Sequence, residues 1–379
     1  MKIDAHYYAI LAFARACGFC KENAYQIAYA SQFVDDAKIN LMFLKKDAET
    51  DIEHDIIGDK HFLVNMATCH SYTRVKTFNY DAMIHNTCAF HFVPGCNGEK
   101  FSEKLRCAED SEVIQRILNQ AVEQADPIKL GIALHAYADT FSHQDFSGLL
   151  SKVNDIKNPE AKSELPFDWR DIAYKIGKFF VRKDKLDKLL DKGLPAYGHG
   201  QASWFPDLPY LKWEFQYDPS SEFAMAHEGK TEIDNPQRFE RAFQKIKMHL
   251  ENFLEKQPQF KDPDIDFQKF DVLFDTLKET KHTRKRIKNW KNLMVDNGLF
   301  EKKELFDKVD AAYDYDENRW LKEAFANFDN EKFHQRTVKD VEPAPDFPNS
   351  NWYKYYLAVG WYKEAFFDNC SKLGLDIPR

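Results

Sequence analysis

The segment that most restricts how this chain can fold is residues 130–143, which read LGIALHAYADTFSH. His135, Asp139 and His143 stand four residues apart, so on an α-helix their side chains share one face. Most of the other positions are apolar or small, which predicts a helix buried against close neighbours. A carboxylate in such surroundings is costly unless a partner neutralises its charge. We therefore expect a buried helix that binds metal; a hydrogen-bonded His–Asp–His stack without metal is the alternative.

The spacing of the two histidines indicates more than one metal ion. His135 and His143 would lie about 12 Å apart along a helix axis, from a rise of about 1.5 Å per residue. That is a long reach for a single tetrahedral ion whose bonds are about 2 Å. Asp139 stands midway and is suited to bridge two neighbouring ions, each with its own histidine.

Additional ligands are available elsewhere in the sequence. Two of them stand two residues apart near the N-terminus, and an Asp–Asp pair ends a predicted helix. Three histidines precede the central helix, and a loop rich in Gly and Pro adds one His and one Asp. Each also has an ordinary structural interpretation, as a surface acid, a helix-end acid or a turn residue. The candidates are Asp4, His6, Asp35, Asp36, His70, His85, His91, His199 and Asp207.

Helical periodicity dominates the chain. Asp126 and Pro127 form a helix start, with Asp as N-cap and Pro in the first turn, so the central helix should span residues 127–146. Because few segments alternate at period two, we expect an all-α, multi-helix bundle. Residues 1–235 would form the metal-binding core and residues 236–379 a C-terminal helical extension. Other helices are expected at 7–17, 22–33, 113–122, 236–256, 272–293, 302–313, 319–328 and 353–369 and within 151–195, with loops at 86–98 and 193–219.

Composition narrows the partners and the compartment. A formal charge of −8 argues against stable nucleic-acid binding, which needs a basic surface. The aromatic content of 15% fits a Phe-rich core and also a lipid-facing cleft. The sequence contains no run of 18 apolar residues, so we do not expect a transmembrane helix. The N-terminus lacks a secretory pattern and the seven cysteines have no framework spacing, which favours the cytoplasm. Export without an N-terminal signal stays open.

Several motifs, taken in order, resemble those of the DUF6765 family. They are DAHY at 4–7, IAYASQFVDD at 27–36, FHFVPG at 90–95, GIALHAYADTFSHQ at 131–144, and Gly198-His199 with Pro206-Asp207. The likeness covers roughly residues 1–240. That family in turn resembles the superfamily of zinc-dependent phospholipases C and P1 nucleases.

The resemblance implies a helical fold that holds two or three zinc ions and hydrolyses phosphoesters. In the secreted relatives the free amino group of an N-terminal Trp is a ligand; here Asp4 could supply an oxygen instead. Relatives often carry H-x3-D-x5-H, whereas this chain has H-x3-D-x3-H, so the partner of His143 stays open. By position, His6 would bind the ion nearest the N-terminus; Asp35, His70 or His91, and His135 a second; His143, His199 and Asp207 a third; and Asp139 would bridge.

The expected function is zinc-dependent hydrolysis of a phosphodiester, in the manner of phospholipase C and in lipid degradation. Zinc would lower the pKa of water and stabilise charge on the phosphoryl group. Asp139 as the bridge and Asp35 as the acid that orients water are the expected catalytic residues, with Asp36 and Asp207 as alternatives to Asp35. The basic run at 281–291 could touch a membrane surface transiently. A P1-like nuclease and a non-catalytic helical protein with a structural metal are the alternatives.

Overall fold

The chain folds around helices and two β-sheets, so the all-α prediction is wrong. The computed structural model describes residues 1–45, 54–69, 82–163, 197–218, 231–307, 309 and 311–378. His70 and the helices expected within 164–195 lie outside this part. The helices of eight or more residues are α1 (Ile10–Cys17), α2 (Lys21–Asp36), α6 (Glu112–Glu123), α7 (Pro127–Ser142), α9 (Asn235–Lys256), α10 (Phe270–Lys278), α11 (Thr283–Asp296) and α14 (Asn351–Lys372).

Shorter elements connect these helices. The π-helical segments are η1 (Asp4–Ala9) and η3 (Met83–Cys88), and the short α-helices are α4 (Ala89–His91), α5 (Phe101–Lys104), α12 (Lys302–Phe306) and α13 (Arg319–Ala324). Single 3-10 turns are η4 (Lys152–Asn154), η5 (Gly200–Ala202), η6 (Phe205–Asp207), η8 (Pro258–Phe260), η9 (Lys332–His334) and η10 (Phe347–Asn349). The strands are β1 (Leu41–Leu44), β2 (Asp55–Ile57), β3 (Lys60–Val64), β4 (Ile156–Ala161), β5 (Lys212–Tyr217), β6 (Thr231–Asp234) and β7 (Thr337–Val341).

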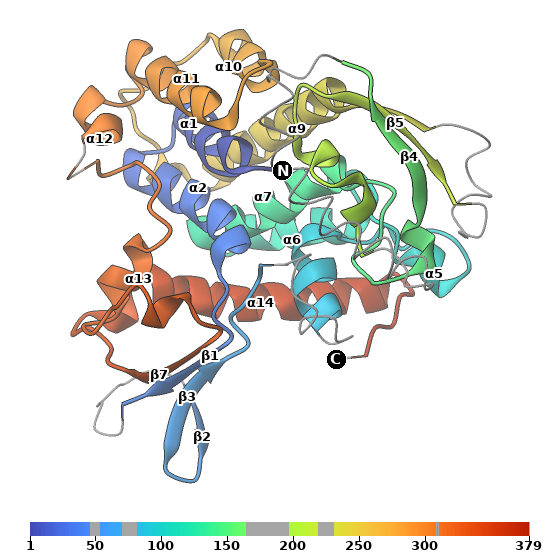
Figure 1. Cartoon of the computed structure of the whole chain (residues 1–379). Coiled ribbons are helices and arrows are strands. Elements are labelled where there is room, and N and C mark those ends of the chain that lie inside the picture. Colours follow the sequence, from blue (N-terminus) through green and yellow to red (C-terminus); the bar gives the residue numbers. More distant parts are fainter. Residues whose placement is uncertain are drawn as a thin grey trace.

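Helix α7 runs through the centre of the molecule (Figure 1), where it contacts α2, α4, α6, α9 and α14. Its start is as predicted: Asp126 Oδ1 accepts hydrogen bonds from the backbone N–H of Ile128 (2.8 Å) and Lys129 (3.2 Å). It ends at Ser142, earlier than the predicted residue 146, and His143 follows as the C-cap. All its residues except Lys129 are buried.

Gly131 allows α2 and α7 to cross closely. A Cβ atom at this position would lie 2.3 Å from the carbonyl oxygen of Ile27 and 2.8 Å from the Cβ of Ala30. No side chain fits in that space, so the contact needs glycine. The crossing brings the C-terminal end of α2 beside the polar face of α7.

One sheet has the strand order β2-β3-β1-β7, so it joins strands from the N-terminal part of the chain to a strand from the C-terminal part. β1 pairs in parallel with β7, with Leu41 opposite Thr337 and Met42 opposite Val338. Because these strands are three to five residues long, alternation at period two has too few positions to be recognised. β2 and β3 form a local hairpin, whereas β1 pairs with the distant β7, which no local pattern specifies.

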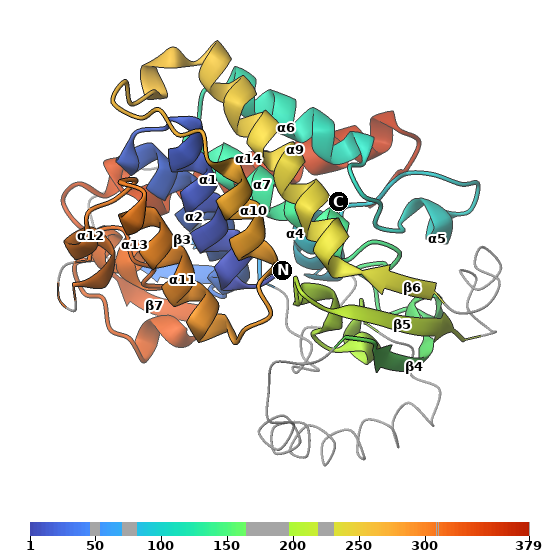
Figure 2. The same cartoon turned by 90° about the horizontal axis from the view of Figure 1, so that it is seen from above.

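The second sheet has the order β4-β5-β6 and lies to one side of α9 (Figure 2). β5 reads KWEFQY, and its alternate residues Trp213, Phe215 and Tyr217 enter a small core. This alternation was present within the predicted loop 193–219 and was missed. β4 at Ile156–Ala161 likewise contradicts the helices expected from residue 151.

Other boundaries also differ from the predictions. The helix expected at 272–293 is divided into α10 and α11 by a break at residues 279–282. The loop expected at 86–98 begins with the end of η3 and with α4, so His91 is helical. Both predicted parts of the chain contribute to one hydrophobic core, which includes residues from Met1 to Ile377. None of the helices in the described ranges has the length and apolar character needed to cross a membrane.

Candidate metal centre

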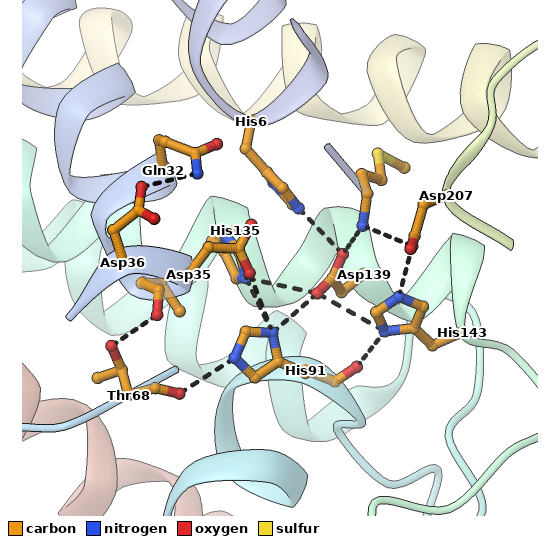
Figure 3. Close-up of polar contacts among 12 residues, drawn as sticks. His6, Gln32, Asp35, Asp36, Thr68, His91, His135, Asp139, His143 and Asp207 are labelled. Atoms are coloured by element: carbon orange, nitrogen blue, oxygen red, sulfur yellow. Dashed lines mark hydrogen bonds and ion pairs between the residues drawn. The ribbon is translucent and has the colours of Figure 1, made fainter. Parts of the chain in front are cut away.

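Asp139 of α7 lies at the middle of a buried polar cluster (Figure 3). Its side chain is 1% exposed, and its two oxygens face different partners. Oδ1 is 3.1 Å from His6 Nε2 and 2.5 Å from the α-amino nitrogen of Met1. Oδ2 is 3.2 Å from His91 Nδ1 and 3.4 Å from His135 Nε2.

Five segments distant in sequence supply the cluster. η1 carries His6, the end of α2 carries Asp35, and α4 ends at His91. α7 and its C-cap carry His135, Asp139 and His143, while the loop with η5 and η6 carries His199 and Asp207. Figure 3 shows most of these side chains converging on Asp139.

Three groups within the described residues could hold a metal ion, since the ligand atoms of each group lie within 4.8 Å of one another. His135 belongs to two of the groups, so the sites formed by these two groups would be neighbours. The groups are His6, Asp35 and His135; His91, His135 and Asp139; and His143, His199 and Asp207.

The end of the cluster near α2 contains its most exposed carboxylate. Asp35 is 28% exposed, and its Oδ1 lies 3.8 Å from His91 Nδ1 and 3.9 Å from His135 Nε2. The rings of His6 and His135 stack with their centroids 3.9 Å apart. Solvent therefore reaches this end through Asp35, while the imidazoles are sealed.

At three imidazoles, one ring nitrogen is held by a backbone carbonyl. His91 Nε2–H donates to the Thr68 carbonyl at 3.1 Å, and His143 Nδ1–H donates to the His91 carbonyl at 2.7 Å. His199 Nδ1–H donates to the Ser203 carbonyl at 2.8 Å. Because a carbonyl only accepts, the other nitrogen of each neutral ring carries a lone pair. A backbone partner of this kind fixes the tautomer and orientation of a metal-binding histidine.

These lone pairs meet the oxygens of carboxylates. His91 Nδ1 is 3.2 Å from Asp139 Oδ2, and His143 Nε2 is 3.0 Å from Asp207 Oδ1. A lone pair and an anionic oxygen at these distances repel each other unless a cation or a proton lies between them. The donor set is therefore suited to bind cations.

Burial and neighbouring charges set the protonation of the cluster. Burial lowers the pKa of His6, His91 and His135, and lowers that of His199 to about 4 with the help of His143. Neutral imidazoles are the form that binds metal. Burial would raise the pKa of Asp139, but His143, the Met1 amine, His6 and His135 together hold it well below its usual value.

The α-amino group of Met1 is the cation of the cluster. Its nitrogen lies 2.5 Å from Asp139 Oδ1 and 3.3 Å from Asp207 Oδ1. Burial acts to lower its pKa, yet Asp139, Asp207 and Asp35 raise that pKa to about 10. The amine thus lies between Asp139 and Asp207, which belong to different ligand groups. Bound metal would need this position beside the two carboxylates. Reasoning from the sequence did not place Met1 here.

Several candidates lie elsewhere. Asp4 turns away from the cluster and pairs with Arg286, with Oδ2 2.6 Å from Nε. Asp36 Oδ2 accepts hydrogen bonds from Tyr315 (2.7 Å) and Gln32 (3.0 Å). The His85 ring packs on Phe367 with a centroid separation of 4.9 Å. The structure thus brings together His6, Asp35, His91, His135, Asp139, His143, His199 and Asp207.

Comparison with known proteins assigns the chain to a family. No curated protein and no solved structure matches the sequence. The profile of DUF6765, described as a family of unknown function, matches residues 1–370. This match covers nearly all of the chain, including the cluster and the C-terminal helices that pack around it. The chain therefore belongs to the DUF6765 family.

Proposed function

We propose that the chain is a zinc-dependent phosphodiester hydrolase that acts in the manner of phospholipase C. The observation that carries this proposal is the orientation of the imidazoles: backbone carbonyls hold one nitrogen of His91, His143 and His199. The other ring nitrogen faces Asp139 at His91 and Asp207 at His143. A cation between each nitrogen and its carboxylate would satisfy both atoms.

The ligand types fit zinc. Imidazole nitrogens and carboxylate oxygens in groups of three are the usual protein ligands of a catalytic zinc ion, which keeps one further position open. Asp139 is suited to bridge, because Oδ1 faces His6 whereas Oδ2 faces His91 and His135. Bound zinc supplies a Lewis acid that stabilises charge on a phosphoryl oxygen and lowers the pKa of water.

The chain's own residues supply the remaining steps. Asp35 combines a place in a ligand group with 28% exposure, so it can orient an incoming water and accept its proton. Asp207 is 17% exposed and holds the opposite end of the cluster. The buried imidazoles keep their positions and exclude bulk water from the phosphate.

A phospholipid is the substrate class that we favour. A pocket that none of the clustered ligands lines includes Asp36, the sequence neighbour of Asp35, and the aromatic side chains of Phe33, Trp352 and Tyr356. Apolar surface at this position suits the non-phosphate part of a substrate. The formal charge of −8 disfavours a polynucleotide.

A structural metal centre is the second candidate. All five histidines in the three groups are 2% exposed or less, as in a centre without substrate access. The exposure of Asp35 favours the hydrolase instead. Activity separates the two candidates, because both bind metal.

The first experiment is elemental analysis of the purified protein, followed by hydrolysis assays on phospholipid vesicles and on single-stranded DNA. His135→Ala should remove metal and activity. His249→Ala is the matched control, since this partly buried histidine packs on Tyr137 away from the cluster. Activity on DNA alone would exclude the lipase, metal without hydrolysis would support the structural centre, and no metal at all would defeat the proposal.

A further inference from the structure

We infer that the buried ion pair of Asp4 and Arg286 is a positioning device for the N-terminal ligands. Asp4 belongs to η1, and Arg286 to α11 in the C-terminal region. The inference rests on the metal centre of the proposed function. It assigns an internal role to Arg286, which stands in the basic run 281–291 that the sequence suggested for transient membrane contact.

Arg286 is fully engaged within the protein. Its Nε donates to Asp4 Oδ2 at 2.6 Å, its Nη2 donates to the Leu277 carbonyl at 2.9 Å, and its Nη1 donates to the Glu279 carbonyl. The side chains of Arg286 and Asp4 are 1% and 2% exposed. The two carbonyls belong to the end of α10, so the guanidinium joins α10, α11 and η1 at one point.

The Arg286 guanidinium also lies near the segment that carries Asp207. Its central carbon is 5.9 Å from the centre of the Tyr210 ring. Tyr210 follows η6, which ends at Asp207. Arg286 therefore contacts η1, which carries His6, and lies near the segment that follows Asp207. Figure 2 shows α10 and α11 beside the N-terminal helices.

Backbone hydrogen bonds connect η1 to the residues that precede it. The Lys2 carbonyl accepts the backbone N–H of Ala5 (2.8 Å) and of His6 (2.9 Å), so the helical hydrogen bonds reach back almost to the first residue. Residues two positions apart on a helix lie on nearly opposite sides. Asp4 thus faces α11 while His6 faces Asp139, and the contact of Asp4 determines where the Met1 amine and His6 lie.

A buried ion pair is weak evidence for stability, because desolvation offsets its attraction. Two apolar residues could fill the same space. An ion pair with three directed donors fixes orientation more sharply than apolar packing does. Metal–ligand distances fall within about 0.2 Å of their usual values in a well-formed site, so the orientation of each ligand matters here.

The test is Asp4→Asn, with Asp262→Asn as the matched control. Asp262 pairs at 3.0 Å with Arg15, a buried arginine that also donates to backbone carbonyls but lies away from the cluster. We expect Asp4→Asn to weaken the binding of one zinc ion by about 10- to 100-fold in chelator competition, as loss of a supporting partner typically does. The remaining zinc and the control protein should be unchanged.

A second readout needs no metal. The rate at which an acylating reagent labels the Met1 amine, measured by peptide mass spectrometry, should rise in Asp4→Asn because the amine loses its buried position. If the single variant folds poorly, Asp4→Asn/Arg286→Gln leaves no unpaired charge and should recover part of the zinc affinity.

Unchanged labelling together with unchanged zinc affinity in Asp4→Asn would overturn the inference, and so would equal effects in Asp262→Asn. A wild-type protein that binds no zinc would defeat the proposed function, whereas the labelling experiment would still decide the positioning role.

Discussion

Replacing Asp139 by Asn should remove more metal than replacing His143 by Ala. The substitution keeps the shape of the side chain but removes its charge and one ligand oxygen. Asp139 oxygens lie 3.1 to 3.4 Å from nitrogens of His6, His91 and His135. Ions bound by those nitrogens therefore sit close to the carboxylate and are stabilised by its charge.

The size of the effect follows from electrostatics. Two unit charges 4 Å apart attract by about 4 kcal/mol at an effective dielectric constant of 20. Zinc carries two charges, so the unit-charge figure is a lower bound. Each 1.4 kcal/mol is a tenfold change in affinity, so every ion beside Asp139 should bind at least about 1000-fold more weakly in Asp139→Asn. His143→Ala removes a neutral ligand from one group and should weaken one ion only.

Elemental analysis after dialysis against graded chelator measures both variants. Asp110→Asn is the control on the outer side of α7, where Asp110 accepts a hydrogen bond from Tyr137 at 2.8 Å. We expect Asp139→Asn to lose at least two ions at a chelator strength that removes one from His143→Ala. Equal losses in the two variants would refute the bridging role.

Three further predictions concern neighbouring groups. Burial raises the pKa of Asp35 to about 7 in the metal-free protein, and this carboxyl must lose its proton to bind metal. Zinc affinity should therefore rise with pH up to about 7 in chelator titrations and depend less on pH in Asp35→Asn. Gly131→Ala should cost roughly 1–3 kcal/mol in urea unfolding, because its methyl group meets the Ile27 carbonyl. Gly360→Ala, in the interior of α14, has open space and should stabilise by roughly 0.5–1 kcal/mol; equal costs at the two positions would contradict the close crossing. Tyr356→Ala should raise KM for phospholipid several-fold and leave kcat unchanged if the aromatic pocket binds substrate. A fall in kcat alone would count against that role.

Local signals made α7 predictable. The Asp126 cap, the Pro in the first turn and the four-residue spacing act within one helix, so no tertiary information was needed. The four-residue spacing also put His135 and Asp139 on one face. The family resemblance suggested His6, His199 and Asp207, which the fold brings to the same cluster.

Pairing between distant segments is absent from any local pattern. β1 pairs with β3 on one side and, on the other, with β7, which lies almost 300 residues later. β5 did carry a visible alternation, but its setting among Gly, Pro and aromatic residues favoured a loop. The choice among the histidines before α7 also needed the fold, since α4 directs His91 to Asp139 while His85 packs on Phe367.

The N-terminus shows the division most clearly. The sequence by itself determined that His6 and a central His–Asp–His helix were candidates for one metal centre, because residue type and helical spacing are local properties. Only the tertiary structure decided that Asp4 pairs with Arg286 and that the Met1 amine faces Asp139. In an extended chain Asp4 and His6 would share a side; the helical turn of η1 separates them, and packing against α11 fixes which one reaches the cluster.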